Sequence, residues 1–338
     1  MDNQHVGKHS VQIKYAPVIR GWSSIAGKKE GNGPLRNYFD KVITDSYFQQ
    51  NSWELAERKL QQTALDLLLK KTKKKHSDIG VVLSGDLLNQ CISSSSSLVN
   101  MNIPHLGLYG ACSTMAESIM IGSMLVSCGF YDDVVAITSS HFASSERQYR
   151  FPLNYGGQRP PSSQWTVTGS GAVLLSKNGS GPKVTGCTIG SVVDFGVTDA
   201  NNMGCAMAPA AFETIQTHFS DFNIDPTYYD YIVTGDLGMM GVESLLQLAE
   251  QNGINLSGKV LDCGLEIFDR SNQDVHSGGS GCGCSALVLC SSLLDQLNTG
   301  KLKRILFCGT GALLSPTSVQ QGLSIPGVCH AVAIEGVI

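Results

Sequence analysis

The chain has 338 residues, 42% hydrophobic and 15% charged, which is long enough to bury a large core in two domains or in one duplicated domain. Its formal net charge of −4 argues against a general nucleic-acid-binding protein, which would present a strongly basic surface. No apolar run has the length of a membrane span, and the N-terminal segment lacks the apolar core of a secretory signal. Eleven cysteines, an odd number with several in apolar runs, indicate reduced thiols in a cytoplasmic fold rather than disulfides.

The first predicted elements are a short strand at residues 11–15 and a polar, glycine-rich loop at residues 21–34. A long helix follows, with Asn51 or Ser52 as its N-cap. Its apolar face is predicted to hold Leu55, Leu60, Ala64, Leu65 and Leu68. The helix ends in the lysines of residues 70–75, which form either a solvated helix end or a patch for anionic lipid headgroups.

A buried strand at residues 79–84 leads to a polar segment with Asn89 and Gln90 and to a serine-rich turn at residues 93–97. At residues 106–122 a strand-like run passes through a tight turn to Cys112 and then into a helix with a buried face. The first-turn amides and the helix dipole favour a thiolate at such a junction, so Cys112 is a candidate nucleophile. The alternative is that Cys112 simply fills a tight turn.

A second buried strand, DVVAITSSHF at residues 133–142, places His141 just past its end, where ligands collect in open α/β sheets. Residues 143–165 are predicted to form a long irregular loop that carries Arg147, Arg150 and Arg159. The next strand, residues 166–175, contains the Gly-Ser-Gly segment 169–171. This segment indicates close backbone packing rather than a phosphate-binding loop.

The second half of the chain repeats the order of the first. After a turn cluster at residues 179–182, YIVTGDLGMM (231–240) mirrors GVVLSGDLL (80–88), and KRILFCG (303–309) matches the strand that follows the Cys112 helix. HSGGSGCGCSALVLC (276–290) stands where the Cys112 segment stands, and its C-x-C has no second cysteine pair, so no metal site is predicted. We therefore predict two similar α/β halves, residues 1–181 and 182–338.

These features together resemble the thiolase and ketoacyl-synthase superfamily, and ketoacyl synthases III most closely. The resemblance rests on the duplication, the cysteine that opens a buried helix, the strand GSGAVLL and the strand end GTGALLSP. Within the superfamily, SSHFASSERQYRFPLNYGGQRPPSSQWTVTGSGA, VLSGDLLNQ and GDLGMMG are similar to the stage V sporulation AD family of endospore-forming bacteria. The resemblance covers nearly the whole chain and implies a duplicated, layered αβαβα fold.

The same resemblance implies a protein that binds pyridine-2,6-dicarboxylate (dipicolinic acid), either free or as its calcium chelate, and helps to load it into the developing spore. Its implied partners are the membrane proteins of the same sporulation operon and a second copy of the chain. Its implied location is peripheral, at the inner spore membrane. The resemblance implies no cofactor apart from calcium that accompanies the ligand.

Condensing enzymes of this superfamily need a thiolate and two neutral donors, usually histidine with asparagine or a second histidine. In ketoacyl synthases III the first donor lies in a V-P-H-Q-A-N-like segment, where this chain has VTGDLG, with Gly235 and Gly238 at the donor positions. The second lies in an H-G-N-T-S-like segment, where this chain has HSGGS, with Gly278 in place of the asparagine. Losing one such donor typically costs about 10²–10³ in rate, so the resemblance predicts a pseudoenzyme.

A receptor for a dicarboxylate needs cations or N–H donors around flat apolar walls. The residues expected to meet at the pocket are Cys112, Asn89, His141, Arg147, Arg150, Arg159, Asp236 and His276. Each also has a structural interpretation: hydrogen bonding for the histidines, local ion pairs for the arginines and helix capping for Asp236. Two other functions stay open, an acyltransferase that uses Cys112 and a scaffold that contacts partners through its dimer surface or residues 70–75.

Overall fold

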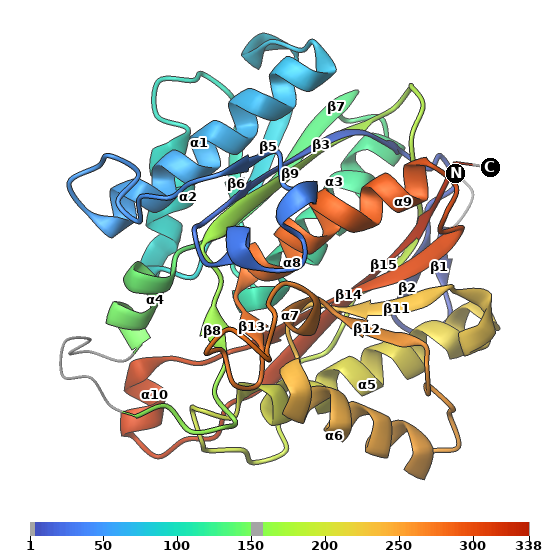
Figure 1. Ribbon diagram of the computed structural model, residues 1–338. Helices are drawn as coiled ribbons and strands as arrows, with labels where there is room; N and C mark the ends of the chain where they lie inside the picture. The colour runs from blue at the N-terminus through green and yellow to red at the C-terminus, as the bar shows by residue number, and fades with distance from the viewer. Residues whose placement is uncertain (1–3, 150–157, 338) are drawn as a thin grey trace.

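The computed structural model describes residues 4–149 and 158–337 (Figure 1). The first half contains β1 (His5–Val6), β2 (Ser10–Gln12), β3 (Val18–Ala26), β4 (Lys41–Val42), α1 (Trp53–Thr72), β5 (Val81–Gly85), α2 (Ile92–Ser97), β6 (His105–Gly107), α3 (Thr114–Ser127), β7 (Asp133–Ser140), α4 (Phe142–Tyr149), β8 (Trp165–Thr166) and β9 (Gly169–Ser176). The second contains β10 (Lys183–Thr188), α5 (Met203–Phe222), β11 (Tyr231–Thr234), α6 (Gly238–Gln251), β12 (Val260–Asp262), α7 (Cys263–Glu266), β13 (Gly279–Ser280), α8 (Cys282–Val288), α9 (Leu294–Asn298), β14 (Arg304–Ala312), α10 (Pro316–Gln320) and β15 (Gly327–Glu335).

The two halves build their main strands in the same spatial order. From the outer edge inward, the first half runs β6-β5-β7-β9-β3 and the second runs β12-β11-β14-β15-β10. The first two pairings of each series are parallel and the last two are antiparallel. The halves meet where Lys183 of β10 pairs with Val18 of β3. The internal repeat predicted from the sequence is therefore confirmed, and the predicted division after residue 181 falls just before β10.

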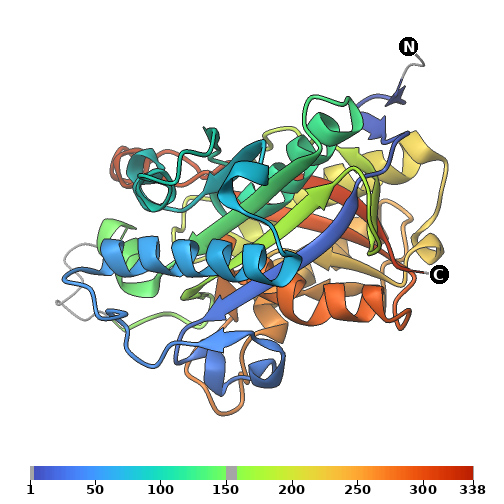
Figure 2. The same ribbon diagram turned by 90° about the horizontal axis from the view of Figure 1, so that it is seen from above.

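The molecule is layered in the predicted αβαβα order (Figures 1 and 2). Helix α1 covers β3, β7 and β9 on the outside of the first half, and α5, paired with α6, covers β14 and β15 of the second. The middle layer holds α3 and α8: α3 contacts β5 and β7 of its own half and β14 and β15 of the other, and α8 packs on β7 and β9. The Cys112 helix is thus enclosed by both halves.

Helix α1 follows the predicted capping and apolar pattern with one exception. The Ser52 hydroxyl accepts a hydrogen bond from the Leu55 N–H, so Ser52 is the N-cap. Leu60 and Leu68 are buried as predicted, but Leu55 is 38% exposed. Ala56 and Glu57 in the same turn are buried, so Leu55 lies off the buried face of the helix. The helix ends at Lys73, which adopts the left-handed conformation at a φ of 57°.

The Gly-Ser-Gly segment of β9 lies directly against α8. A Cβ atom at Gly169 would lie 2.4 Å from Leu287 Cδ1, and one at Gly171 would lie 2.5 Å from the Ala286 carbonyl oxygen. These contacts confirm close backbone packing as the reason for the glycines.

Three segments that were predicted to be irregular form regular secondary structure in part, so these predictions are partly wrong. Tertiary contacts stabilise the strand and the helices that form there. Residues 21–26 continue β3 rather than opening a loop, since Gly21 allows the strand to pass beneath Thr72 of α1. The serine-rich turn is helix α2, which is held by Asp86, whose carboxylate accepts hydrogen bonds from the Ser94 N–H and hydroxyl at 2.7 and 2.6 Å. The start of the predicted 143–165 loop is helix α4. No helix in the described ranges is both long and apolar enough to cross a membrane.

Candidate functional site

Cys112 lies at the predicted junction between a tight turn and a buried helix. It is the middle residue of the single turn Ala111–Ser113, which leads directly into α3. Ala111 has a φ of 50°, in the left-handed region that L-residues rarely adopt, so the chain bends sharply just before the helix. Cys112 is 7% exposed and faces a cavity with an empty volume of about 590 Å³. We call this cavity the Cys112 pocket.

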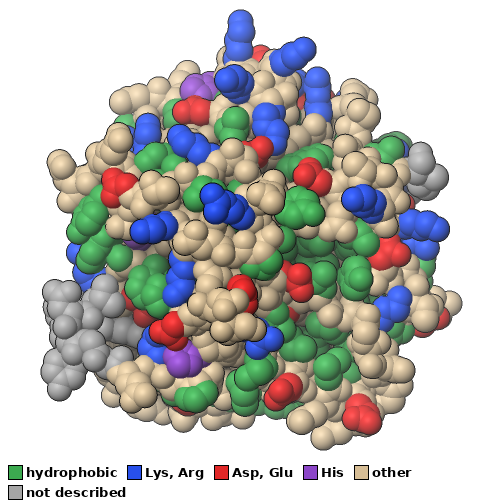
Figure 3. Space-filling model, in the orientation of Figure 1, with side chains coloured by type: hydrophobic (Ala, Val, Ile, Leu, Met, Phe, Trp, Pro, Cys, Tyr) green, Lys and Arg blue, Asp and Glu red, His purple; other side chains and the backbone are tan. Residues whose placement is uncertain are grey.

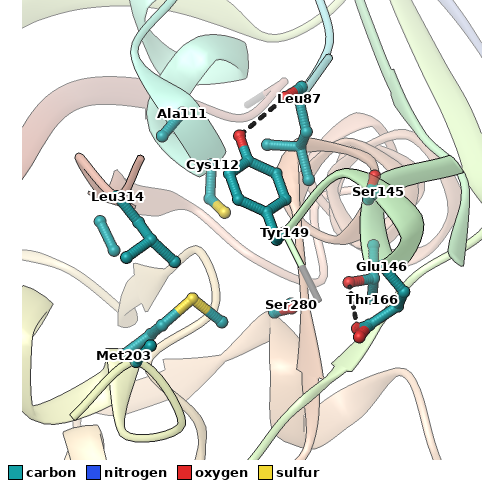
Figure 4. Close-up of a pocket in the computed structure, with 12 residues that line it drawn as sticks. Leu87, Ala111, Cys112, Ser145, Glu146, Tyr149, Thr166, Met203, Ser280 and Leu314 are labelled. Carbon is teal, nitrogen blue, oxygen red and sulfur yellow. Dashed lines mark hydrogen bonds between the residues drawn. The ribbon is translucent and has the colours of Figure 1, made fainter. Parts of the chain in front are cut away.

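The walls of the Cys112 pocket are mostly apolar and come from both halves of the chain (Figure 4). Tyr149 of α4 closes one side, and its hydroxyl donates a hydrogen bond to the Leu87 carbonyl oxygen at 2.8 Å. Met203 and Leu314 line the opposite side. Among the described residues, the lining includes no lysine, arginine or histidine; its one ionisable carboxyl group is that of Glu146.

The environment of Cys112 favours the thiol over the thiolate. Burial raises the pKa of Cys112 well above its usual range, and the nearby Asp236 and Cys282 raise it further. A hydrogen bond from the Gly281 N–H acts in the opposite direction but more weakly. The prediction that the helix dipole favours a thiolate here is therefore wrong, because desolvation and a neighbouring carboxyl group outweigh it.

Among the described residues of the predicted set, Asp236 is the polar side chain that reaches Cys112. It is fully buried, and its carboxyl oxygens accept hydrogen bonds from the Gly281 N–H at 2.8 Å and the Thr310 hydroxyl at 2.9 Å. Burial raises its pKa to about 7, although the hydrogen bond from the Cys112 thiol lowers it. Asp236 therefore changes between a neutral acid and a buried anion near neutral pH.

The glycines expected at the donor positions serve the local backbone. Gly238 has a φ of 63° at the start of α6, and its N–H donates to the Asp262 carboxylate at 3.1 Å. Gly278 has a φ of 122°, and a Cβ there would lie 2.7 Å from the Gly264 carbonyl oxygen. These positions tolerate no donor side chain without strain, and the described lining of the pocket supplies no imidazole in their place.

Arg159 and His276 meet outside the Cys112 pocket, on Asp274. The Arg159 guanidinium lies 2.9 Å and the His276 ring nitrogen 3.2 Å from the same Asp274 carboxylate oxygen. Asp274 is itself largely exposed. The two residues thus meet in a local cluster around Asp274, and neither lines the Cys112 pocket.

His141 lies beyond the end of β7, as predicted, but both of its ring nitrogens are used locally. Nε2 lies 2.8 Å from the Ser46 carbonyl oxygen, and Nδ1 accepts a hydrogen bond from the Ala143 N–H at 3.2 Å. Burial lowers the pKa of His141, so the ring is neutral, with its proton on Nε2. His141 orders the loop that follows β7 rather than facing Cys112.

Asn89 and Arg147 lie on one neighbouring surface, away from the Cys112 pocket. Arg147 pairs with Glu54 of α1 and lies over the Trp53 ring, and the Asn89 N–H donates to the Gln148 side chain at 2.9 Å. Arg150 lies outside the described residues. Of the described residues expected to converge, the structure brings Asp236 against Cys112, although Asp236 does not itself line the Cys112 pocket. It does not bring Asn89, His141, Arg147, Arg159 or His276 to this pocket.

Sequence reasoning missed the aromatic side of the pocket. Tyr149 and Leu87 both line the pocket beside Cys112, and the Tyr149 hydroxyl lies 2.9 Å from the hydroxyl of the half-exposed Tyr109. Tyr149 falls within a segment that was predicted to be irregular, and only the helical α4 directs its ring inward. No group of acidic, histidine or cysteine side chains in residues 4–149 and 158–337 could hold a metal ion.

Comparison with known proteins gives the family. The sequence profile of the Stage V sporulation protein AD (SpoVAD) family matches residues 7–335. A Stage V sporulation protein AD of Bacillus subtilis (strain 168) is 43% identical over 329 residues, which cover 97% of each chain. The chain belongs to the stage V sporulation protein AD family. The resemblance inferred from the sequence motifs is confirmed.

Solved structures place this SpoVAD-family chain on a thiolase-like fold. The 3-oxoacyl-[acyl-carrier-protein] synthase III of Aquifex aeolicus VF5 aligns with a TM-score of 0.55 and 12% identity, over 95% of this chain and 99% of that one. An OleA variant from Xanthomonas campestris aligns with a TM-score of 0.59 and 14% identity, over 95% and 98%. At such identities these structures show the fold alone. The chain is therefore a sporulation protein built on the fold of condensing enzymes.

Proposed function

We propose that this sporulation protein is a non-catalytic member of the thiolase superfamily that binds dipicolinate for uptake into the developing spore. One observation supports the proposal that the protein is not a catalyst. The buried carboxyl group of Asp236 lies beside Cys112, where a condensing enzyme needs a neutral hydrogen-bond donor. An ionised Asp236 would repel both a thiolate and an enolate. The raised pKa of Cys112 also disfavours the thiolate that a condensing reaction needs.

The binding part is supported by family membership together with what the fold retains. The chain keeps a mostly apolar pocket at Cys112, the kind of concave site in which small molecules bind, and its described lining offers no histidine to activate the thiol. A protein that keeps such cavities without the condensing chemistry is suited to holding a small molecule. Calcium would enter with the ligand, as part of its chelate.

Titration of the purified protein with dipicolinate, alone and with calcium, tests the proposal. We expect saturable heat by calorimetry, and no binding of either form would contradict dipicolinate as the ligand. Acyl-CoA with a malonyl acceptor should give no turnover at pH 8 or at pH 6, where a protonated Asp236 could donate a hydrogen bond. A turning-over acyl adduct seen by intact mass, absent in Cys112→Ala, would instead establish an acyltransferase.

We further propose that the protein acts peripherally at the inner spore membrane, beside the membrane proteins of its operon, with the lysine end of α1 toward the lipid. Figure 3 shows basic side chains gathered over the C-terminal end of α1, at the top of the view. Lys71 and Lys74 pair with Asp40 and Asp133 at 3.0 and 2.6 Å. The other three lysines of this helix end, Lys70, Lys73 and Lys75, are exposed and have no carboxylate partner in the described structure.

Sedimentation with vesicles tests this orientation. Vesicles rich in phosphatidylglycerol should carry the protein down at low salt, because each lysine near an anionic surface contributes about 1 kcal/mol. A triple Lys70→Gln, Lys73→Gln, Lys75→Gln variant should lose roughly 100-fold in partitioning. Neutral vesicles are the control for charge. Equal sedimentation of the variant and the wild type would exclude this surface.

We also propose a homodimer formed along the outer edge of the first half. Strand β6 ends the sheet there, and it pairs with β5 on one side only among the described residues. Leu106 in this strand is 48% exposed and the following Tyr109 is 46% exposed. An edge strand with exposed apolar side chains is a template for pairing with another copy.

A further inference from the structure

One end of the first half gathers the connections that precede its central strands. Helices α1 and α3 are each joined by a short connection to one of the parallel strands β5 and β7, so both helices finish where these strands begin. In Figure 1 both helices run toward the upper right of the view. Strand β9 ends there too, because Ser176 pairs with Asp133, the first residue of β7. We call this end, residues 73–80, 128–132 and 177–182, the base of the first half.

We propose that the base lies against an anionic lipid surface and that Phe130 inserts into the bilayer there. The inference rests on the proposed peripheral location and names the side chain that enters the membrane. Phe130 is 71% exposed, more than any other large apolar side chain in the described ranges. The neighbouring Tyr131 ring lies on Gly80, where a Cβ atom would come within 2.4 Å of it. Tyr131 therefore anchors the loop, while Phe130 projects into the solvent, where an apolar ring is unfavourable.

The loop that carries Phe130 is fixed at both ends. Gly129 ends α3 with a φ of 77°, and the Phe130 N–H donates a hydrogen bond to the Leu125 carbonyl oxygen at 3.0 Å. Two residues later, the Asp132 carbonyl oxygen accepts a hydrogen bond from the Lys177 N–H at 2.8 Å. These bonds hold the loop in one conformation, which lowers the entropy cost of an insertion. They also pair backbone groups that would be costly to leave unpaired in a bilayer.

A basic groove opens at the same end of the molecule. Its described lining includes the cations Arg20, Lys71 and Lys73 and no carboxylate. The stem of Arg20 crosses the turn after β9, where a Cβ atom at Gly179 would lie 3.4 Å from Arg20 Cδ. Arg20 is exposed and has no carboxylate partner in the described structure. A guanidinium suits a phosphate group, so the groove can receive lipid headgroups while Phe130 reaches the hydrocarbon.

The exposed carboxylates of the base are met by groups of the protein. Asp132, beside Phe130, lies 3.5 Å from the Lys177 ammonium group, and the Asp78 carboxylate accepts a hydrogen bond from the Lys75 N–H at 2.8 Å. Arg20 and the three unpaired lysines of the α1 end therefore give the base an excess of positive charge. An apolar ring that projects from a basic surface complements anionic headgroups above a hydrocarbon layer.

Cys128 provides a natural position for a reporter of insertion. It is exposed and lies two residues before Phe130, whereas Cys205 is partly exposed and the remaining cysteines are buried. In a Cys205→Ser background, an environment-sensitive fluorophore on Cys128 should shift to the blue with vesicles rich in phosphatidylglycerol. Vesicles of phosphatidylcholine alone should leave its emission unchanged. Phe130→Ser should abolish the shift and lower partitioning about tenfold, as expected when one phenyl ring is no longer buried.

Matched variants separate insertion from general attraction and from ligand binding. Phe195 is 67% exposed but lies past the far end of β10, so Phe195→Ser should partition like the wild type. Phe130→Trp should keep both signals, because tryptophan favours the membrane interface. All these variants should bind dipicolinate with wild-type affinity by calorimetry, so a failure of dipicolinate binding would leave the membrane contact standing.

Three outcomes would overturn the inference. Vesicle binding that Phe130→Ser does not weaken, with no fluorophore shift, would exclude insertion and keep the charged surface alone. No binding to phosphatidylglycerol vesicles would exclude both and leave dipicolinate as the ligand. A lower mass of Phe130→Ser in light scattering would assign the ring to a contact between copies of the chain.

Discussion

Replacing Asp236 with asparagine should raise the free energy of unfolding at pH 8 and flatten its dependence on pH. Burial raises the pKa of Asp236 to about 7, whereas an unfolded aspartate ionises near pH ~4. Between these values the folded chain holds a proton that the unfolded chain has lost, so stability falls as the pH rises through this window. A shift of about three pKa units corresponds to roughly 4 kcal/mol. The contribution is complete below pH ~4 and lost above pH ~7.

Asparagine can keep the local hydrogen bonds without the charge. Its carbonyl can accept from the Gly281 N–H, and its amide can donate to the Thr310 hydroxyl oxygen. Urea unfolding at pH 5, 6, 7 and 8 measures the effect, and the gap between variant and wild type should widen with pH. Some slope will remain in the variant, because burial also raises the pKa of Glu30 to about 7 and of Asp262 to about 6.

The exposed Glu250 on α6 provides the control for this substitution. No ion pair joins its side chain to another described residue, and Glu250→Gln should follow the wild-type profile at every pH. If Asp236→Asn also followed the wild-type profile, the buried carboxyl group beside Cys112 would not titrate in this range. The account of the lost condensing chemistry would then need another basis.

Replacing Leu106 with lysine should convert the proposed dimer into a monomer. Two copies of β6 related by a two-fold axis would place Leu106 near the centre of the shared edge, and a lysine there would bring two positive charges together. Light scattering should show the mass fall from twice to once the 36.1 kDa of the chain. The loss should be nearly complete at micromolar concentration, since apolar edge contacts would supply most of the interface.

Leu323→Lys is the control, because Leu323 is 53% exposed, similar to Leu106, but follows α10 and is not part of the β6 edge. It should remain a dimer. A wild-type chain that is monomeric would contradict the proposed assembly. A dimeric Leu106→Lys variant would place the contact on another surface.

Much of the fold was predictable because its signals are local. Buried strands such as β5 and β7 are continuous apolar runs in the sequence, and Ser52 is a typical N-cap residue that predicts the start of α1. The repeated order of these runs predicted the duplication that the strand order confirms. The segments that were misread, residues 21–26 and helices α2 and α4, carry weak local signals and are ordered by contacts with α1 and with Asp86.

The features of the candidate site likewise divide into those that the sequence predicted and those that only the structure revealed. The sequence alone determined that a cysteine opens a buried helix in a duplicated thiolase-like chain, and it predicted glycines at the positions of the usual donors. Only the tertiary structure decided that Asp236, from the other half, lies against Cys112, and that Arg159 and His276 meet on Asp274 instead. It also placed Phe130 and the lysines that end α1 at the same end of the sheet. The physical reason is that periodicity and capping act within a few residues, whereas burial and charge pairing depend on which distant segments the sheet brings together.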